Sequence, residues 1–308
     1  MSPNYPLPQF MEQFGYSDSK LINVYEPAWL IGLNEIYTEE NFEEIMAYVI
    51  VQAAKSFIDC IDEDAYRSSQ KLSREYNGIS ESKSDEDSAY DKTLSIFSDN
   101  ISRVYIKQYL DAGIKEEITK MCQDAIDTYM EMIDATSWLS EETRKQAKYK
   151  LANMTIHAVY PDKWADDSMY FVTSREEGGT YLQAIMDIKK SDHEKELTHI
   201  NGRVDREIWG INILSTNAYY NAGNNSINII LGFFCDVTYR SDMSVEEKYG
   251  ALGAVIGHEI SHAFDTNGAQ FDADGNINII EVKDVETKLL EVDKVYYDQS
   301  LICNAYDQ

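Results

Sequence analysis

The feature that most constrains this 308-residue chain is the segment GHEISHAFD at residues 257–265. His258 and His262 are four residues apart, so on an α-helix their side chains point the same way, one turn apart. Two imidazoles in that arrangement can bind one tetrahedral zinc ion. Glu259 beside them can accept a proton from water whose pKa the metal has lowered. The segment therefore predicts a zinc site on a helix.

An accidental HExxH pattern is improbable here. The chain has five histidines, and chance predicts well under about 0.01 occurrences of the pattern in a chain of this composition. The alternative interpretation is a buried amphipathic helix with two hydrogen-bonded histidines. The apolar face that would seat such a helix in a core is supplied by Val255, Ile256 and Ile260. The zinc-site interpretation requires the same apolar face.

The charge balance excludes one class of partner. The chain has 54 Asp and Glu against 27 Lys and Arg, for a net charge of −27. A field of that sign repels nucleic-acid phosphate and anionic lipid, so no nucleic acid is expected as a partner. The excess acid indicates an acidic, solvated surface, with a preference for cationic ligands as the alternative.

Targeting signals and cysteine usage bear on location. No apolar run approaches the length that spans a bilayer, so membrane association is not indicated. The opening MSPNYPLPQF lacks the basic and apolar regions of a signal peptide, which predicts a cytoplasmic protein. If an N-terminal portion precedes residue 1, the expectation changes to an extracellular or membrane-anchored protein. Four widely spaced cysteines are expected to be free, buried thiols: Cys60, Cys122, Cys235 and Cys303.

The hydrophobic pattern predicts a mostly α-helical α+β protein. The spacing of apolar residues predicts helices over 38–61, 94–109, 116–133 and 140–154. Ser140 is the expected N-cap of the last of these, and Pro161 its expected stop. Residues 76–92 are polar without a periodic apolar face, and they are expected to form a loop.

The pattern changes near Ile208, where we place a domain boundary. Residues 1–208 are expected to form a mostly helical domain, and 209–308 the start of a zinc-binding catalytic domain. Within the second part the sequence predicts three elements, which are a short strand at 227–231, a helix at 245–264 and a helix at 282–297.

Motifs along most of the chain resemble one family. VIGHEISHAFDTNGAQFDADGNI at 255–277, preceded by TNAYYN at 216–221, is similar to the neprilysin and endothelin-converting-enzyme family of zinc metallopeptidases. The likeness includes WLSEETRKQAKYKLANM at 138–154, YPDKW at 160–164 and GRVDREIWG at 202–210. It extends from about residue 23 to residue 299.

The resemblance implies a fold and an activity. The zinc helix would belong to a thermolysin-like catalytic half, and the preceding helices to a second, helical half that is incomplete in this chain. The activity would be zinc-dependent hydrolysis of internal bonds in oligopeptides, with His258 and His262 as zinc ligands and Glu259 as the general base.

The resemblance also implies roles around these three residues. Asn217 and Ala218 would pair with the substrate backbone as an added strand. Asp265 matches an acidic residue of the family motif, where it either orients a zinc ligand or caps the helix end. The remaining histidines match no ligand position and are interpreted as packing or surface residues: His157, His193 and His199.

One family feature is missing from the sequence. A catalytic zinc needs a third protein ligand, which in this family is a glutamate in a later Glu-x-x-x-Asp pattern. Only 46 residues follow His262, and none of their glutamates has an aspartate four places on. The candidates in this tail are Glu281, Glu286 and Glu291.

Three hypotheses follow. The chain is a fragment of a longer active peptidase, or a non-catalytic short form that binds proteins or peptides, or an enzyme whose acidic tail completes the zinc site. An incomplete chain would expose faces that the rest of such a protein covers, so self-association through those faces is also expected.

Overall fold

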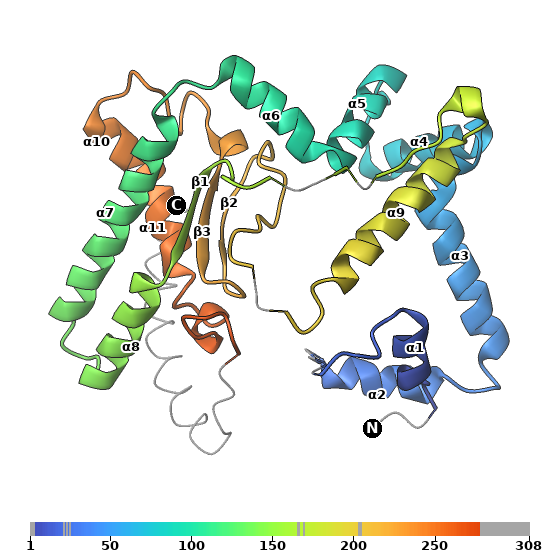
Figure 1. The fold of residues 1–308 in the computed structure, drawn as a ribbon, viewed down its shortest axis with the longest axis horizontal. Coiled ribbons are helices and arrows are strands. Elements are labelled where there is room, and N and C mark those ends of the chain that lie inside the picture. The colour runs from blue at the N-terminus through green and yellow to red at the C-terminus, as the bar shows by residue number, and fades with distance from the viewer. Residues whose placement is uncertain are drawn as a thin grey trace. The chain divides into compact units, whose positions relative to one another are not determined.

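The computed structural model describes residues 4–277 of the chain, apart from positions 21, 23, 25, 165, 166, 169, 203 and 204. The chain divides into two compact units, each formed by two separate segments (Figure 1). Unit 1 comprises Met1–Phe97 and Trp164–Val204, and unit 2 comprises Ser98–Lys163 and Asp205–Gln308. No helix in the described ranges is both long enough and apolar enough to cross a membrane.

Unit 1 is helical. Its helices are α1 (Leu7–Gln13), α2 (Pro27–Ile36), α3 (Phe42–Ile61), α4 (Glu63–Asn77), α5 (Asp85–Ile96) and α9 (Tyr181–Leu197), with a 3₁₀ turn at Arg175–Glu177. Asp62 caps α4 by accepting the amide hydrogen of Ala65 at 2.8 Å, and Gly78 ends it in the left-handed conformation.

The loop predicted at residues 76–92 is wrong in its second half. Helix α5 begins at Asp85, because Ser84 caps it and acidic residues occupy its first turn, where the helix dipole favours them. None of its residues is buried, which agrees with the absence of a periodic apolar face in this segment. The single helix predicted over 94–109 is also wrong, since α5 ends at Ile96 and a separate helix, α6 (Ser98–Tyr109), follows in unit 2.

Unit 2 combines helices with a small sheet. After α6 come α7 (Ile114–Ala135), α8 (Glu141–Ala152), β1 (Thr155–Val159), β2 (Ala218–Asn221), β3 (Ser226–Ile230), α10 (Val245–Lys248) and α11 (Ala254–Ser261). Leu231–Phe233 and Gly268–Gln270 form 3₁₀ turns, and Tyr249–Gly253 forms a π-helical turn between α10 and α11.

The sheet has the strand order β1-β3-β2. Strand β3 pairs in parallel with β1 and antiparallel with β2, so it is the central strand, and all five of its residues are buried. The prediction of a strand here is confirmed. Strand β1 was not predicted. Helix α8 ends at Ala152, well before Pro161, and the β-branched segment that follows pairs with a strand about 70 residues further on.

The core of unit 2 lies between this sheet and the helices α7 and α11, which contact it (Figure 1). Its fully buried apolar side chains come from all of these elements, and include Ile118, Cys122, Leu151, Ile227, Ile229, Leu252, Ile256 and Ile260. Helix α11, which carries the HExxH motif, is therefore seated in this core.

The compact units differ from the predicted division at residue 208. The chain passes between the units near residues 97, 163 and 204, so residues 98–163 belong with the zinc helix. The physical reason is the parallel pairing of β1 with β3, which joins two segments that the pattern of apolar residues treats as separate.

Candidate metal centre and active site

Helix α11 is held firmly in unit 2. Ile256 and Ile260 are fully buried against the core. On the same helix, the carbonyl of Gly257 accepts a hydrogen bond from the hydroxyl of Tyr129 on α7, at 2.8 Å. The π-helical turn that precedes α11 resembles those found beside functional sites in other helices. The predicted helical run over 245–264 is confirmed as far as Ser261.

The two histidines of the motif face each other. The Nε2 atoms of His258 and His262 are 3.2 Å apart, and the ring planes cross at 84°. Two nitrogen ligands of a tetrahedral zinc ion, each about 2.0–2.1 Å from the metal, are roughly 3.3 Å apart. The spacing in this structure therefore fits zinc. His258 is exposed and His262 is half-buried, which leaves the pair open to solvent.

Asp265 fixes the orientation of His262. Its Oδ2 lies 2.7 Å from Nδ1 of the imidazole, while its Oδ1 accepts the amide hydrogens of Gly268 at 2.7 Å and Asn267 at 2.9 Å. Burial raises the pKa of Asp265, but these hydrogen bonds outweigh it and hold the pKa below its usual value. A carboxylate at this place favours the tautomer with the ring proton on Nδ1, which leaves the Nε2 lone pair for a metal. This geometry favours the ligand-orienting role over a helix cap alone.

Glu259 lies between the histidines in sequence and is 8% exposed. Its carboxylate has no hydrogen bond or ion pair with another described residue. A nearly buried carboxylate without a partner among the described residues is available to a water molecule or substrate beside the histidines.

The segment predicted to bind substrate lies at a sheet edge. Ala218 is the buried first residue of β2, and Asn217 precedes it on the surface. Among the described strands, β2 is an edge strand, and α11 packs against it and against β3. The edge to which an extended peptide could add is thus beside the zinc helix.

A third metal ligand is not found among the described residues, where no group of three or more His, Cys, Asp or Glu side chains could hold a metal. Glu281, Glu286 and Glu291 lie outside the described residues, as do Cys303 and the helix predicted over 282–297.

The other histidines are engaged elsewhere or exposed. His157 is buried in β1, where Nδ1 lies 2.6 Å from Oδ1 of Asn228 and the ring stacks on Trp209. His193 makes a 3.0 Å contact with the carbonyl of Phe14, and His199 is exposed. These surroundings agree with packing and surface roles.

The three described cysteines are free, as expected. Only Cys122 is fully buried, and burial raises its pKa to about 12. Cys60 is half-buried and Cys235 is exposed, so the expectation that all are buried is wrong. Cys235 is exposed although its neighbour Phe234 packs against the core and Tyr239 lies within it.

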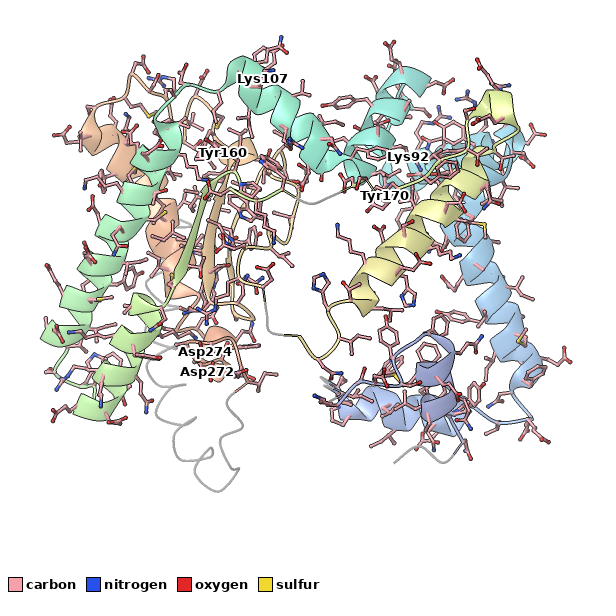
Figure 2. The ribbon with its side chains drawn as sticks, viewed as in Figure 1. Lys92, Lys107, Tyr160, Tyr170, Asp272 and Asp274 are labelled. Atoms are coloured by element: carbon pink, nitrogen blue, oxygen red, sulfur yellow. The ribbon has the colours of Figure 1, made fainter. Side chains whose placement is uncertain are left out.

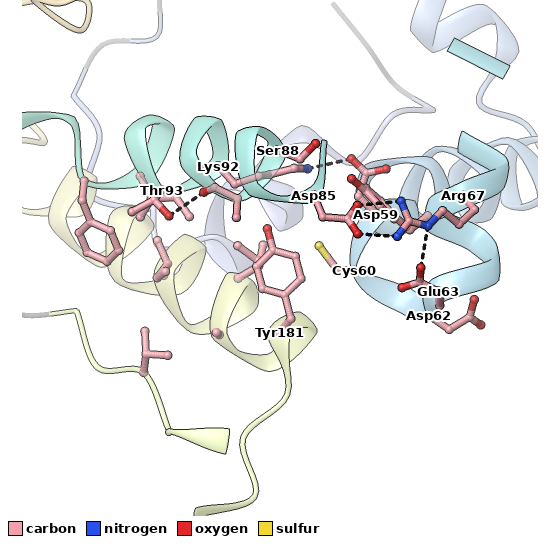
Figure 3. A pocket seen from close by; sticks show the side chains of 18 residues that line it. Asp59, Cys60, Asp62, Glu63, Arg67, Asp85, Ser88, Lys92, Thr93 and Tyr181 are labelled. Carbon is pink, nitrogen blue, oxygen red and sulfur yellow. Dashed lines mark hydrogen bonds and ion pairs between the residues drawn. The ribbon is translucent and has the colours of Figure 1, made fainter. Parts of the chain in front are cut away.

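A cavity of about 600 Å³ lies in unit 1 (Figure 3), and none of the predicted site residues line it. Most of its charged groups are paired with each other. Lys92 contacts Asp59 at 2.7 Å, and Arg67 contacts both carboxylate oxygens of Asp85 at 2.7 Å. These pairs join α3 to α5 and α4 to α5, so the cavity is a seam between helices.

Lys150 was not predicted from the sequence as a residue of the site. Its ammonium group is buried near the end of α8 and donates to three backbone carbonyls in the segment after α11. Burial lowers its pKa to about 8. A signal was present, because Lys150 is three residues after Ala147 and four before Met154, a spacing that places a lysine on the apolar face of the helix.

The fold and the histidine pair together define the metal-binding helix of a zinc peptidase. Comparison with known proteins agrees. A model of the N-terminal part of peptidase family M13 matches residues 1–161, and a second model of the same family matches residues 217–305. The chain belongs to peptidase family M13, and the resemblance to the neprilysin family is thereby confirmed.

Relatives and solved structures show how much of the family the chain covers. The neutral endopeptidase of Lactococcus lactis is 29% identical over 278 residues, which is 89% of this chain and 43% of that protein. Neprilysin of Oryctolagus cuniculus is 25% identical, over 82% of this chain and 34% of its own length. The crystal structure of PepO from Lactobacillus rhamnosis matches with a TM-score of 0.73 and 27% identity, over 81% of this chain and 39% of that one. The chain thus spans less than half the length of these proteins.

Proposed function

We propose that this chain carries the zinc-binding and proton-transferring part of a metalloendopeptidase that hydrolyses internal peptide bonds of oligopeptides. The observation that carries the proposal is the 3.2 Å spacing of the His258 and His262 Nε2 atoms on a core-seated helix. Membership of family M13 and the relatives named neutral endopeptidase support the same reaction class.

Each residue of the site would have a separate role. His258 and His262 would hold the zinc ion, and Asp265 keeps the His262 ring turned toward it. When bound, zinc lowers the pKa of a coordinated water to near 7 and polarises the substrate carbonyl. Glu259 accepts the proton of the attacking water and returns it to the leaving amine, as a general base that becomes a general acid.

The edge strand β2 would hold the peptide. An extended substrate beside Asn217 and Ala218 would use main-chain hydrogen bonds, which tolerate many side chains and place one carbonyl repeatably near the histidines. Helix α11 contacts β2, so the peptide and the zinc site would be held by one rigid unit.

The third ligand comes from outside the described residues in this proposal. It belongs either to the acidic tail, at Glu281, Glu286 or Glu291, or to a further part of a longer protein. Because the chain spans 43% of the Lactococcus relative, the longer protein is the favoured source.

The test measures zinc stoichiometry of the purified 308-residue chain after dialysis, with cleavage of a fluorogenic peptide on the same sample. About one retained zinc with cleavage would place the third ligand in the acidic tail. Weak zinc binding without cleavage would assign activity to the longer protein. No zinc binding would contradict the proposal and favour a non-catalytic peptide-binding protein.

Glu259→Gln separates the proton-transfer role from metal binding. It should abolish cleavage, in this chain or in the longer protein, and leave zinc content unchanged. Glu246→Gln, at an exposed position of α10, is the matched control and should leave both unchanged. Cleavage that persists in Glu259→Gln would show that another group activates the water.

A further inference from the structure

The segment that follows the zinc helix is bound by a buried cation from another helix. Lys150 of α8 is 6% exposed. Its Nζ donates to the carbonyls of Ala263 at 2.9 Å, Gly268 at 2.7 Å and Phe271 at 2.7 Å. An ammonium group has three N–H donors, so these bonds use all of them.

The three carbonyls bracket the residue that orients a zinc ligand. Ala263 directly follows His262, and Gly268 donates its amide hydrogen to Asp265. The same loop continues to Asp272 and Asp274 (Figure 2). Lys150 therefore ties together both ends of the turn that holds Asp265 against the His262 ring.

The same lysine is linked to the proposed substrate strand. Its backbone carbonyl accepts a 3.0 Å hydrogen bond from Nδ2 of Asn225, a fully buried residue that has a φ of +50°. Asn225 in turn accepts a 2.9 Å hydrogen bond from the hydroxyl of Tyr220 on β2. The Lys150 ammonium lies 5.9 Å from the centre of the Tyr220 ring. One residue thus contacts the segment after α11 and the end of β2.

Electrostatics favours a cation at this place. Ala263 lies two residues after the C-terminal end of α11, a region where unpaired carbonyls and the helix dipole attract positive charge. Burial lowers the pKa of Lys150, and the nearby carboxylates Asp272 and Asp265 offset part of this effect. A tetrahedral ammonium can point toward three carbonyls in different directions, which the planar guanidinium of arginine cannot match.

We infer that Lys150 is a positioning residue of the zinc site: by fixing the 263–271 segment, it holds Asp265 and the His262 ring in their metal-binding orientation. This inference rests on the proposed function. Loss of a group that supports a metal ligand commonly weakens metal binding by about 10–100-fold. We expect that range for Lys150→Met, which keeps the length and the apolar stem of the side chain.

The matched control is Arg206→Met. Arg206 also binds this loop, but further along, at the carbonyl of Ala273 at 2.8 Å and at Asp274 at 2.9 Å. Its removal takes a cation from the same loop without touching Ala263 or Gly268. We expect zinc affinity within about threefold of the unchanged chain, because the supports of Asp265 remain.

The experiment is a Zn²⁺ titration of the full 308-residue chain against a chromophoric chelator, with thermal unfolding of the metal-free forms. A selective loss of affinity in Lys150→Met supports the inference. The inference would be overturned if Lys150→Met bound zinc as tightly as the unchanged chain, or if Lys150→Met and Arg206→Met lost the same amount of affinity. Either result would leave the proposed function standing. No zinc binding by the unchanged chain would overturn both this inference and the proposed function.

A milder variant keeps the test decisive if Lys150→Met does not fold. Lys150→Gln retains two N–H donors on a shorter side chain, and it should lose less affinity than the methionine variant but more than Arg206→Met. A folded Lys150→Gln with unchanged zinc affinity would contradict the positioning role.

Discussion

The two units differ in how they bury apolar side chains. In unit 2, residues of α7, α11 and the sheet pack into one core, and Ile227, Ile256 and Ile260 are fully buried. In unit 1, helices α1 to α5 contain no buried residue, and Ile188 of α9 is the only one in its helices among the described positions. Helical propensity alone therefore does not make a core.

Helix α3 shows what this difference means. Tyr48, Val49 and Ile50 are 65%, 53% and 61% exposed, although they are consecutive apolar residues in a 20-residue helix. A helix that is apolar on adjacent faces is normally covered on most sides. The described residues cover α3 only in part, and the chain spans 43% of its Lactococcus relative. The described residues of unit 1 thus leave these apolar side chains of α3 exposed, whereas α11 of unit 2 is packed into a core.

The largest expected effect tests this contrast directly. Ile227→Ala in the centre of β3 should reduce the free energy of unfolding by about 2–5 kcal/mol, because it leaves a cavity in the core. Ile50→Ala in α3 should change it by less than about 0.5 kcal/mol. Urea unfolding of both variants measures the difference. If Ile50→Ala reduced the free energy of unfolding as much as Ile227→Ala, α3 would be covered in solution. The proposed difference between the two units would then be wrong.

A second effect tests whether the core of unit 2 holds a strained residue. Val159 is fully buried with a φ of +68°, a conformation that costs a side chain bearing Cβ about 1–2 kcal/mol. Glycine removes this cost and alanine does not. Val159→Gly should therefore be at least as stable as Val159→Ala by thermal unfolding.

At a control position we expect the opposite order of stability for the glycine and alanine variants. At Val104, an exposed position within α6, the glycine variant should be less stable than the alanine variant by about 1 kcal/mol. The same order at both positions would show that Val159 is not strained.

A third comparison uses one cap from each unit. The hydroxyl oxygens of Ser140 and Ser84 each accept a hydrogen bond from the backbone amide three residues later in the chain. The N···O distances are 3.1 Å and 3.0 Å. Ser140→Ala should destabilise unit 2 by about 1 kcal/mol, since the first turn of α8 loses that acceptor. Ser84→Ala should leave unit 2 unchanged. Hydrogen exchange of the α7 and β3 amides measures this, and equal effects would show that the units unfold together.

The smallest effect is a pH dependence within unit 2. Hydrogen bonds from Lys248, at 2.7 Å, and from Tyr239 hold the pKa of Glu117 below its ordinary value of 4.5. Because the pKa is lower in the folded chain, this carboxylate adds stability above about pH 4.5. That stability is lost as the pH falls through the lowered folded value.

Glu117→Gln is the variant that isolates this effect. It should be less stable than the unchanged chain at pH 7, and the difference should shrink on acidification in urea titrations. Glu131→Gln, an exposed change on the same helix, should show no such trend. A difference that does not vary with pH would exclude the carboxylate as its source.

Local spacing accounts for the predictions that hold. The histidine pair depends on a four-residue interval within one helix, and Ser140 caps α8 through a contact over three residues. The mostly helical character and the strand at β3 also follow from patterns a few residues long. Such features need no knowledge of distant segments.

Polar helices and tertiary pairings account for the predictions that fail. Helix α5 is stabilised by its Ser84 cap and the charges of its first turn, which a search for apolar periodicity does not detect. The short strand β1 follows directly after α8 and becomes a strand by pairing with β3. The compact units differ from the predicted division at residue 208 for the same reason.

The sequence by itself determined that this chain carries an HExxH helix, a mostly helical fold and membership of a metallopeptidase family, because each rests on residues close together along the chain. Only the tertiary structure decided what supports the site. Lys150 reaches from α8 to the segment after α11, and α11 packs against β2. These contacts join segments up to more than a hundred residues apart, and the free energy that selects them comes from packing and buried hydrogen bonds that no local pattern encodes.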